Sequence, residues 1–393
     1  MIRGYRRPNG RVGVRNVVAI IPTSVSTAGL ATAIADGLGT WARATPHQMG
    51  THPPAGARKQ TERTLIGVGR HPNVGGAVVV GHGTEALGVR DLQAAIEEHD
   101  TPVRTVVVRE VGGARTATAR GRALATALYD EIAAAERVEI GLDELIVGVA
   151  SSSNDVTSGV AAHPAIGAVS DRLVAAGGTV VMGGTAGFIG AEAVLSSRCE
   201  KRTVRDRIAQ YIEYRERFVR RMGVELGTVG PTDAQRKGGL TTIEEISHGT
   251  VMMTGTAPVE VIFPYAYQLP VGRGFVLMDT PTHHVEHVVG QVAGGAQLVV
   301  RSAGRDCPPG NPIAPVITVT AHPDTARRMN DQVDVDLTDL LVDADPACGA
   351  DRVIDAIEAA ANGRRTAAER LGLNAWALNE VQPAQLAGTG TMT

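Results

Sequence analysis

Two histidines of this 393-residue chain lie at a spacing that suits acid–base or metal chemistry. In the stretch THHVEH (282–287), His283 and His287 are four positions apart, which would place them on one face of a helix. Such a pair could bind a divalent ion, or one imidazole could act as a general base near neutral pH. The metallopeptidase spacing is absent, because His284 occupies the place that a glutamate would need. A solvated helix start is an equally good interpretation of the same residues.

Further reactive or polar side chains lie in loops that we expect to follow strands. The loop HQMGTH (47–52) contains two more histidines, GHGTE (81–85) contains a glutamate, and SSSND (151–155) contains an asparagine and an aspartate. If these loops share one edge of a sheet, they bring hydroxyl, amide and carboxylate groups to a polyhydroxy acid. The same residue types are also the preferred helix N-caps, so capping is the alternative interpretation for each serine.

Four arginines crowd the stretch GYRRPNGRVGVRN (4–16), although the chain has a net charge of only −3. Arg15 directly precedes the first apolar run, and its planar fork matches a carboxylate. We expect it to bind the carboxylate of an anionic substrate, whereas Arg6, Arg7 and Arg11 are equally well explained as solvated charge. The nearly neutral balance excludes a general nucleic-acid binder.

The elements that must position these residues alternate between short apolar runs and amphipathic helices. This pattern predicts an α/β protein with two Rossmann-like or flavodoxin-like parallel-sheet domains, 1–139 and 140–393, that face a shared cleft. Ligands bind outside the carboxyl ends of such strands. Residues 224–274 are expected to form an irregular Gly/Thr-rich insertion, and 382–393 a flexible tail.

Composition predicts a cytoplasmic protein. The three cysteines suggest neither a disulfide framework nor a zinc motif, and no apolar segment is long enough to be a signal peptide or a membrane span.

Several motifs resemble the altronate/galactarate dehydratase family, which includes the large subunit of sulfolactate sulfo-lyase. They are GYRRPNGRVGVRN, HQMG, RHPNVGGAVVVGHGTE, SGVAAHPAIGAVSDRLVAAGGTVV, KGGLTTIEEISHG, GFVLMDTP and AGGAQLVVRSAGR, in order along nearly the whole chain. The resemblance implies a lyase that removes the proton next to a carboxylate and expels a β-substituent, with iron or another divalent cation. It also implies that the small N-terminal domain of single-chain members is absent here. We therefore expect a small anionic substrate, and either a homodimer or a separate small subunit as partner.

This chain departs from the family pattern at chemically related positions. Where members typically carry cysteines, it has hydroxyl residues, namely Ser26, Thr51, Thr84 and Ser151. An acidic pair is replaced by Gly184 and Gly187, and a lysine by Ile246. Neutral hydroxyls are poor iron ligands. We therefore predict no family-type iron site and no cofactor, with histidines taking over the acid–base chemistry.

The resulting hypothesis is a divergent carbon–oxygen lyase acting on a small hydroxy acid. Its candidate catalytic residues are His47, His52, Asp155, His283 and His287. Its candidate substrate-binding residues are Arg15, Ser26, Gln48, Thr51, Thr84, Glu85, Ser151, Asn154, Glu192, Glu245, Asp279 and Arg305. The alternatives are a hydrolase, isomerase or cyclising enzyme on the same scaffold, and a non-catalytic binding subunit.

Overall fold

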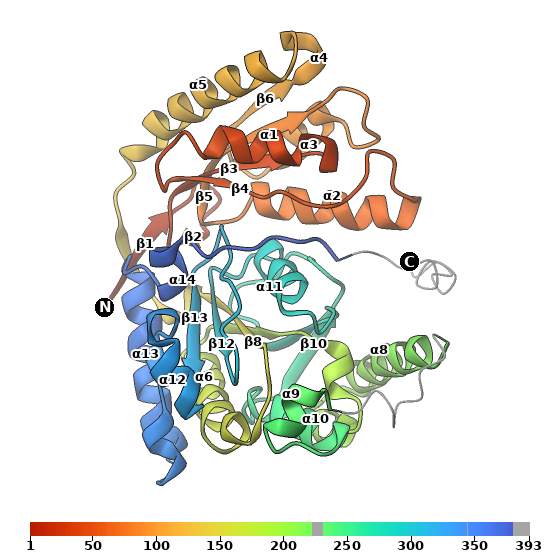
Figure 1. The fold of residues 1–393 in the computed structure, drawn as a ribbon, viewed down its shortest axis with the longest axis vertical. Helices are drawn as coiled ribbons and strands as arrows, with labels where there is room; N and C mark the ends of the chain where they lie inside the picture. The colour runs from red at the N-terminus through yellow and green to blue at the C-terminus, as the bar shows by residue number, and fades with distance from the viewer. Residues whose placement is uncertain (222–230, 344, 380–393) are drawn as a thin grey trace.

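A computed structural model describes residues 1–221, 231–343 and 345–379 of the chain (Figure 1). Its N-terminal lobe is built around a four-stranded parallel sheet in the order β4-β3-β5-β6. These strands are β4 (Ala42–Ala44), β3 (Val17–Pro22), β5 (Val74–Gly81) and β6 (Val103–Val107). Every residue of β3 and β5 is buried, which explains why both are uninterrupted apolar runs.

Helices cover both faces of this sheet. One face packs against α1 (Val25–Ala35) and α5 (Ala114–Ala133), and the other against α2 (Ala55–Gly69) and α3 (Val89–Glu97). Between β6 and α5 lies the short α4 (Val108–Val111).

The C-terminal lobe contains a seven-stranded parallel sheet in the order β10-β11-β9-β8-β12-β13-β14. Its strands are β10 (Val259–Phe263), β11 (Gly274–Met278), β9 (Thr179–Met182), β8 (Ile146–Ser151), β12 (Leu298–Ser302), β13 (Val316–Thr320) and β14 (Val335–Asp336). On one face lie α6 (His163–Ala175) and α13 (Pro346–Ala361), and on the other α11 (His284–Ala293). Two sheets of parallel strands flanked by helices confirm the predicted α/β class.

The two lobes share a hydrophobic core. In Figure 1, α11 lies between them, and it packs against α2 of the N-terminal lobe. Leu65 and Val68 of α2 belong to the same buried cluster as Val289 and Val292 of α11. The domain boundary predicted at 139/140 therefore stays a prediction, because side chains from both sides of it fill this core.

Short elements complete the fold. A small antiparallel sheet joins β2 (Val12–Gly13), β1 (Ile2–Arg6) and β7 (Val138–Ile140). The other helical segments are η1 (Leu142–Glu144), a π-helical turn η2 (Ser158–Ala162), η3 (Thr185–Phe188), α7 (Glu192–Ser197), α12 (Pro323–Arg328), η4 (Asn330–Gln332), η5 (Thr338–Leu341) and α14 (Ala367–Leu371). In the described ranges, no helix has the length and apolarity needed to cross a membrane.

The expectation of an irregular segment at 224–274 is wrong for part of that range. After α8 (Arg202–Arg221), the chain forms α9 (Asp233–Lys237), α10 (Ile243–Met252) and β10. Both new helices begin with a capping box, Thr232 with Gln235 and Thr242 with Glu245. Residues 222–230 and the predicted tail 382–393 lie outside the described residues.

Candidate functional site

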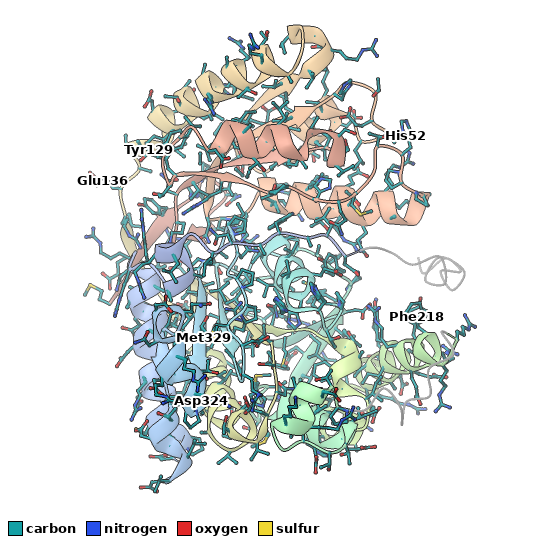
Figure 2. All side chains as sticks on the ribbon, in the orientation of Figure 1. His52, Tyr129, Glu136, Phe218, Asp324 and Met329 are labelled. Atoms are coloured by element: carbon teal, nitrogen blue, oxygen red, sulfur yellow. The ribbon has the colours of Figure 1, made fainter. Side chains whose placement is uncertain are left out.

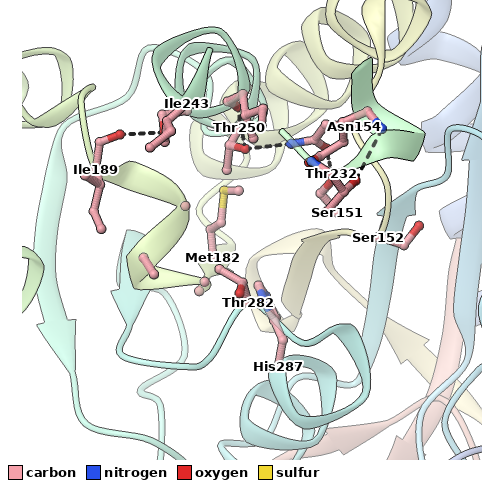
Figure 3. Close-up of a pocket in the computed structure, with 17 residues that line it drawn as sticks. Ser151, Ser152, Asn154, Met182, Ile189, Thr232, Ile243, Thr250, Thr282 and His287 are labelled. Carbon is pink, nitrogen blue, oxygen red and sulfur yellow. Dashed lines mark hydrogen bonds between the residues drawn. The ribbon is translucent and has the colours of Figure 1, made fainter. Parts of the chain in front are cut away.

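A cavity of about 350 Å³ opens in the C-terminal lobe (Figure 3). It lies at the carboxyl ends of the neighbouring strands β8 and β9, where parallel sheets commonly bind ligands. Helices α9 and α10 and the first turn of α11 close its other sides. All of the residues that line it fall between 151 and 287, so the cavity belongs to the C-terminal lobe and not to a junction of both lobes.

His287 is the titratable side chain of this cavity. It is 3% exposed, and its Nε2 lies 3.3 Å from the carbonyl oxygen of Val149. A nitrogen that faces a carbonyl must carry the hydrogen, so Nδ1 keeps its lone pair. Burial lowers the pKa of His287 to about 4 in spite of the bond to the Val149 carbonyl, and the neighbouring His284 contributes to this shift, so the ring is neutral at pH 7.

Nδ1 of His287 is available to a ligand. A Cβ at Gly184 would lie 3.3 Å from this atom, and within the described ranges no protein group forms a hydrogen bond with it. Figure 3 shows the ring rising from α11 toward Thr282, whose hydroxyl also lines the cavity. The arrangement places a neutral base beside a neutral hydrogen-bond donor.

A hydrogen-bonded chain forms the opposite wall. The hydroxyl of Ser151 donates to Oδ1 of Asn154, and Nδ2 of Asn154 donates to the hydroxyl of Thr250 at 3.0 Å (Figure 3). Thr250 in turn donates to the carbonyl of Ile246 within α10. The structure thus brings Ser151 and Asn154 together with His287, as three of the seventeen residues proposed from sequence.

Four of the seven positions at which we expect this chain to depart from the family pattern converge here. Ser151, Gly184, Gly187 and Ile246 all line the cavity. Gly184 has a φ of +77°, a conformation that side chains rarely adopt, and any Cβ there would crowd the His287 ring. The wall beyond them is apolar and includes Met182, Ile189 and Ile243.

His283 and His287 do not converge on one ligand. His283 is the N-cap of α11, its side chain is 58% exposed, and its Nδ1 lies 3.7 Å from Oε1 of Glu286. His287 is buried in the next turn. The helix does place both residues one turn apart, but the His283 side chain is exposed to solvent and His287 is buried.

The histidine loop of the N-terminal lobe lies away from this cavity. His47 is buried, its Nε2 is 2.9 Å from the carbonyl of Pro22, and its Nδ1 accepts the N–H of Met49 at 3.3 Å. Burial lowers its pKa to about 4, and both ring nitrogens are occupied by backbone. His52 is exposed on the N-terminal lobe (Figure 2), with Nδ1 3.1 Å from the hydroxyl of Thr51.

Glu85 organises the neighbouring GHGTE loop. Its carboxylate accepts the N–H groups of His82, Gly83 and Thr84 and the hydroxyl of Thr23. Burial opposes ionisation, but these donors outweigh it and hold the pKa of Glu85 below its usual value. Glu85 therefore shapes the loop, while the Thr84 side chain is exposed.

Two further candidates of the N-terminal lobe have other surroundings. Ser26 is exposed in the first turn of α1. Gln48 holds the C-terminal segment, because its side-chain amide donates to the carbonyl of Leu378 at 2.5 Å and accepts its N–H at 3.2 Å.

Arg15 binds a carboxylate, but one of the protein itself. Its Nε and Nη2 each lie 2.8 Å from an oxygen of Glu369, and its other donors reach the carbonyls of Val14, Ala360 and Arg364. The guanidinium of Arg15 is thus paired with a carboxylate of the protein, and the structure does not support the expectation that it binds the substrate carboxylate. Its role here is to fasten the segment before β3 to α13 and α14.

The acidic candidates are held by neighbouring donors. Oδ1 of Asp155 accepts the hydroxyls of Thr157 and Ser158 and the N–H of Ser158. Asp279 is paired with Arg215 of α8 at 2.9 Å and accepts the hydroxyl of Thr185 at 2.7 Å.

Three other candidates lie outside the cavity lining. Glu192 accepts the N–H of Gly190 at 2.9 Å, and Glu245 closes the capping box of α10, whose backbone donors lower its pKa. Arg305 is exposed.

Several cavity residues were not among the candidates predicted from sequence, namely Thr232, Gln235, Ile243, Ser247 and Thr250 from α9 and α10, as well as Thr282. The capping boxes could have revealed both helices. Nothing in the local sequence indicates that their side chains reach the ends of β8 and β9, because that approach depends on tertiary packing.

The cavity lining does not fit the divalent ion that the resemblance implies. The described residues of the lining offer neutral hydroxyls and amides with one imidazole, and they include no carboxylate or thiolate. Across the part of the chain that the structure describes, no three or more His, Cys, Asp and Glu side chains gather as a metal site would require.

Comparisons with known proteins give a consistent assignment. A family model described as "D-galactarate/Altronate dehydratase, C-terminal" matches residues 142–383, and one described as "D-galactarate dehydratase/Altronate hydrolase, second domain" matches residues 4–133. The (2R)-sulfolactate sulfo-lyase subunit beta of Chromohalobacter salexigens is 32% identical over 375 residues, which cover 94% of each chain.

Longer relatives are matched in part. Altronate dehydratase of Bacillus subtilis is 28% identical over 81% of this chain and 65% of its own length. Galactarate dehydratase (L-threo-forming) of Escherichia coli is 30% identical over 70% of this chain and 53% of its own length. These matches confirm the predicted resemblance and the lyase class. The chain belongs to the D-galactarate/altronate dehydratase family of lyases.

Proposed function

We propose that this chain eliminates a β-substituent from a small substrate with His287 as the general base. One observation carries the proposal: a neutral imidazole nitrogen faces a cavity in which no other lining side chain among the described residues is ionisable near neutral pH. The bond from Nε2 to the Val149 carbonyl holds the tautomer in which Nδ1 accepts the proton from the substrate α-carbon. The Ser151–Asn154–Thr250 chain would orient the substrate's polar groups.

Replacing His287 tests this proposal. His287→Gln keeps a donor for the Val149 carbonyl but removes the base. We expect exchange of the substrate α-hydrogen with D₂O, followed by NMR over a panel of 3-hydroxy acids and their esters, to slow by about 10²–10⁴-fold. His99→Gln in the N-terminal lobe is the control, since it still offers an acceptor to Arg70. Exchange that survives unchanged in His287→Gln would refute the proposal.

We also propose that turnover requires no iron. The support is chemical: hydroxyls and glycines stand where a metal would need thiolates or carboxylates. Purified protein should contain far less than one iron per chain by elemental analysis, and chelators should leave the exchange rate unchanged. Stoichiometric iron together with loss of exchange after chelation contradicts this expectation.

A separate small subunit is the partner that we propose. The sulfo-lyase chain that aligns over 94% of both lengths is called subunit beta, which supports an assembly of more than one kind of chain. We further propose that the enzyme acts in the cytoplasm. Mass spectrometry of tagged protein recovered from its own cells should identify a small companion, and light scattering of the chain alone should show whether it is a homodimer.

A further inference from the structure

The described lining of the cavity around His287 has no fixed charge. Its polar lining consists of hydroxyl and amide side chains, and Lys, Arg, Asp and Glu are absent from the lining that the structure describes. The basic residues that follow Gln235 on α9 are exposed, and Arg236 is paired with Asp233 at 3.1 Å. The sequences 222–230 and 380–393 contain no lysine or arginine.

This neutrality matters for the chemistry of proton abstraction. A proton taken from beside a carboxylate leaves an enediolate with two negative charges, which needs cations close by. A proton taken from beside a neutral carbonyl leaves a single negative charge, which hydroxyl and amide donors can stabilise. The low pKa of His287 makes it a weak base, which also favours the more acidic C–H bond beside a neutral carbonyl.

Suitable donors and an apolar wall are both present. The Thr282 hydroxyl lies beside His287 (Figure 3), and within the described residues it forms no hydrogen bond with protein. Nδ2 of Asn154 uses one hydrogen for Thr250 and has a second. Met182 and Ile246 line the cavity on its apolar side, where an alkyl or acyl group could pack.

We infer that the substrate presents a neutral carbonyl to His287, as a β-hydroxy ketone, ester, thioester or lactone, and not as a free carboxylate. This inference rests on the proposed function. The α-proton passes to Nδ1 of His287, and the C–H electron pair forms the enolate. The C–O bond to the β-hydroxyl then breaks, and the imidazolium returns its proton so that water leaves. The products are an α,β-unsaturated carbonyl compound and water, with His287 neutral again.

Matched pairs of ligands test the inference. We would compare 3-hydroxybutanoate, 3-hydroxypropanoate and 3-hydroxypentanoate with their methyl esters, measuring both α-hydrogen exchange in D₂O and binding by calorimetry. We expect the esters to exchange at least ten-fold faster and to bind more tightly. Faster exchange of the free acids would overturn the inference and leave the proposed function standing. If neither class exchanges, the proposed function fails, and binding alone decides: tighter binding of the esters supports the inference, and equal or weaker binding overturns it.

A charge introduced into the apolar wall provides a second test. Ile246→Lys should shift the ratio of ester to acid affinity toward the acid by at least ten-fold, because the free carboxylate would then meet a cation. Ile246→Met is the matched control, since it has a long side chain without charge. An unchanged ratio in Ile246→Lys, with both variants folded by circular dichroism, would show that the carbonyl does not bind here.

Discussion

At the scale of single residues, side chains of the same type have different roles in this chain. His287 and His47 are both buried and neutral, but His287 leaves one nitrogen facing a cavity, whereas backbone groups occupy both nitrogens of His47. Arg15 shows the same dependence on context. It is the bidentate carboxylate binder that its position suggests, but Glu369 supplies the carboxylate.

Arg15→Ala should therefore reduce stability. Both partners of the Arg15–Glu369 pair are less than 15% exposed, so removing one leaves an unpaired buried charge. We expect the free energy of unfolding in urea to fall by about 3–5 kcal/mol. Glu369 has a pKa lowered by Arg15 in spite of its burial, and Glu369→Gln in the alanine background should recover part of the loss. A normal unfolding midpoint with a raised KM would instead support the substrate clamp.

At the scale of elements, the contact between α2 and α11 joins the lobes. A Cβ at Gly67 of α2 would lie 2.3 Å from the carbonyl oxygen of Ala293, so the two helices meet backbone to backbone. The β8, β9 and α11 segments then meet around the cavity, and α11 thus contributes both to the shared core and, through His287, to the candidate site.

Gly67→Ala should separate these helices. We expect a loss of about 1–3 kcal/mol in unfolding free energy, as is typical of overpacked contacts. Gly29→Ala is the matched control in α1, where a Cβ would meet nothing within 4 Å, and it should stabilise the protein by about 0.5–1 kcal/mol. Equal midpoints for the two variants in a urea titration would show that the close approach is absent.

At the scale of the whole molecule, buried neutral histidines make the fold sensitive to acid. Burial lowers the pKa of His47, His163 and His287 to about 4 and that of His71 to about 3. Their ordinary value is about 6.5, so the unfolded chain binds protons between pH 6.5 and 4 that the native protein does not bind. The unfolding free energy must therefore fall as the pH falls through this range.

Urea unfolding at several pH values would measure this effect. Each of the four histidines contributes on the order of 3 kcal/mol of destabilisation by pH 4. We expect the midpoint to decrease steadily from pH 7 to 5. A constant midpoint would mean that these rings titrate normally and are not buried as described.

Much of the architecture could be predicted from the sequence. Apolar runs such as VVAIIP mark the central strands because parallel strands are buried on both faces. The segment 231–263 was misjudged because its glycines and threonines resemble loop composition, whereas two of its threonines cap helices.

The sequence by itself determined the α/β class and the family. Only the tertiary structure decided which of the seventeen candidate residues share a cavity, because side chains distant in sequence meet through packing of α9, α10 and α11 against strand ends. It also decided which imidazole retains a free nitrogen and which arginine is already paired. Hydrogen-bond partners and burial depend on the whole fold, and local patterns of residues do not encode them.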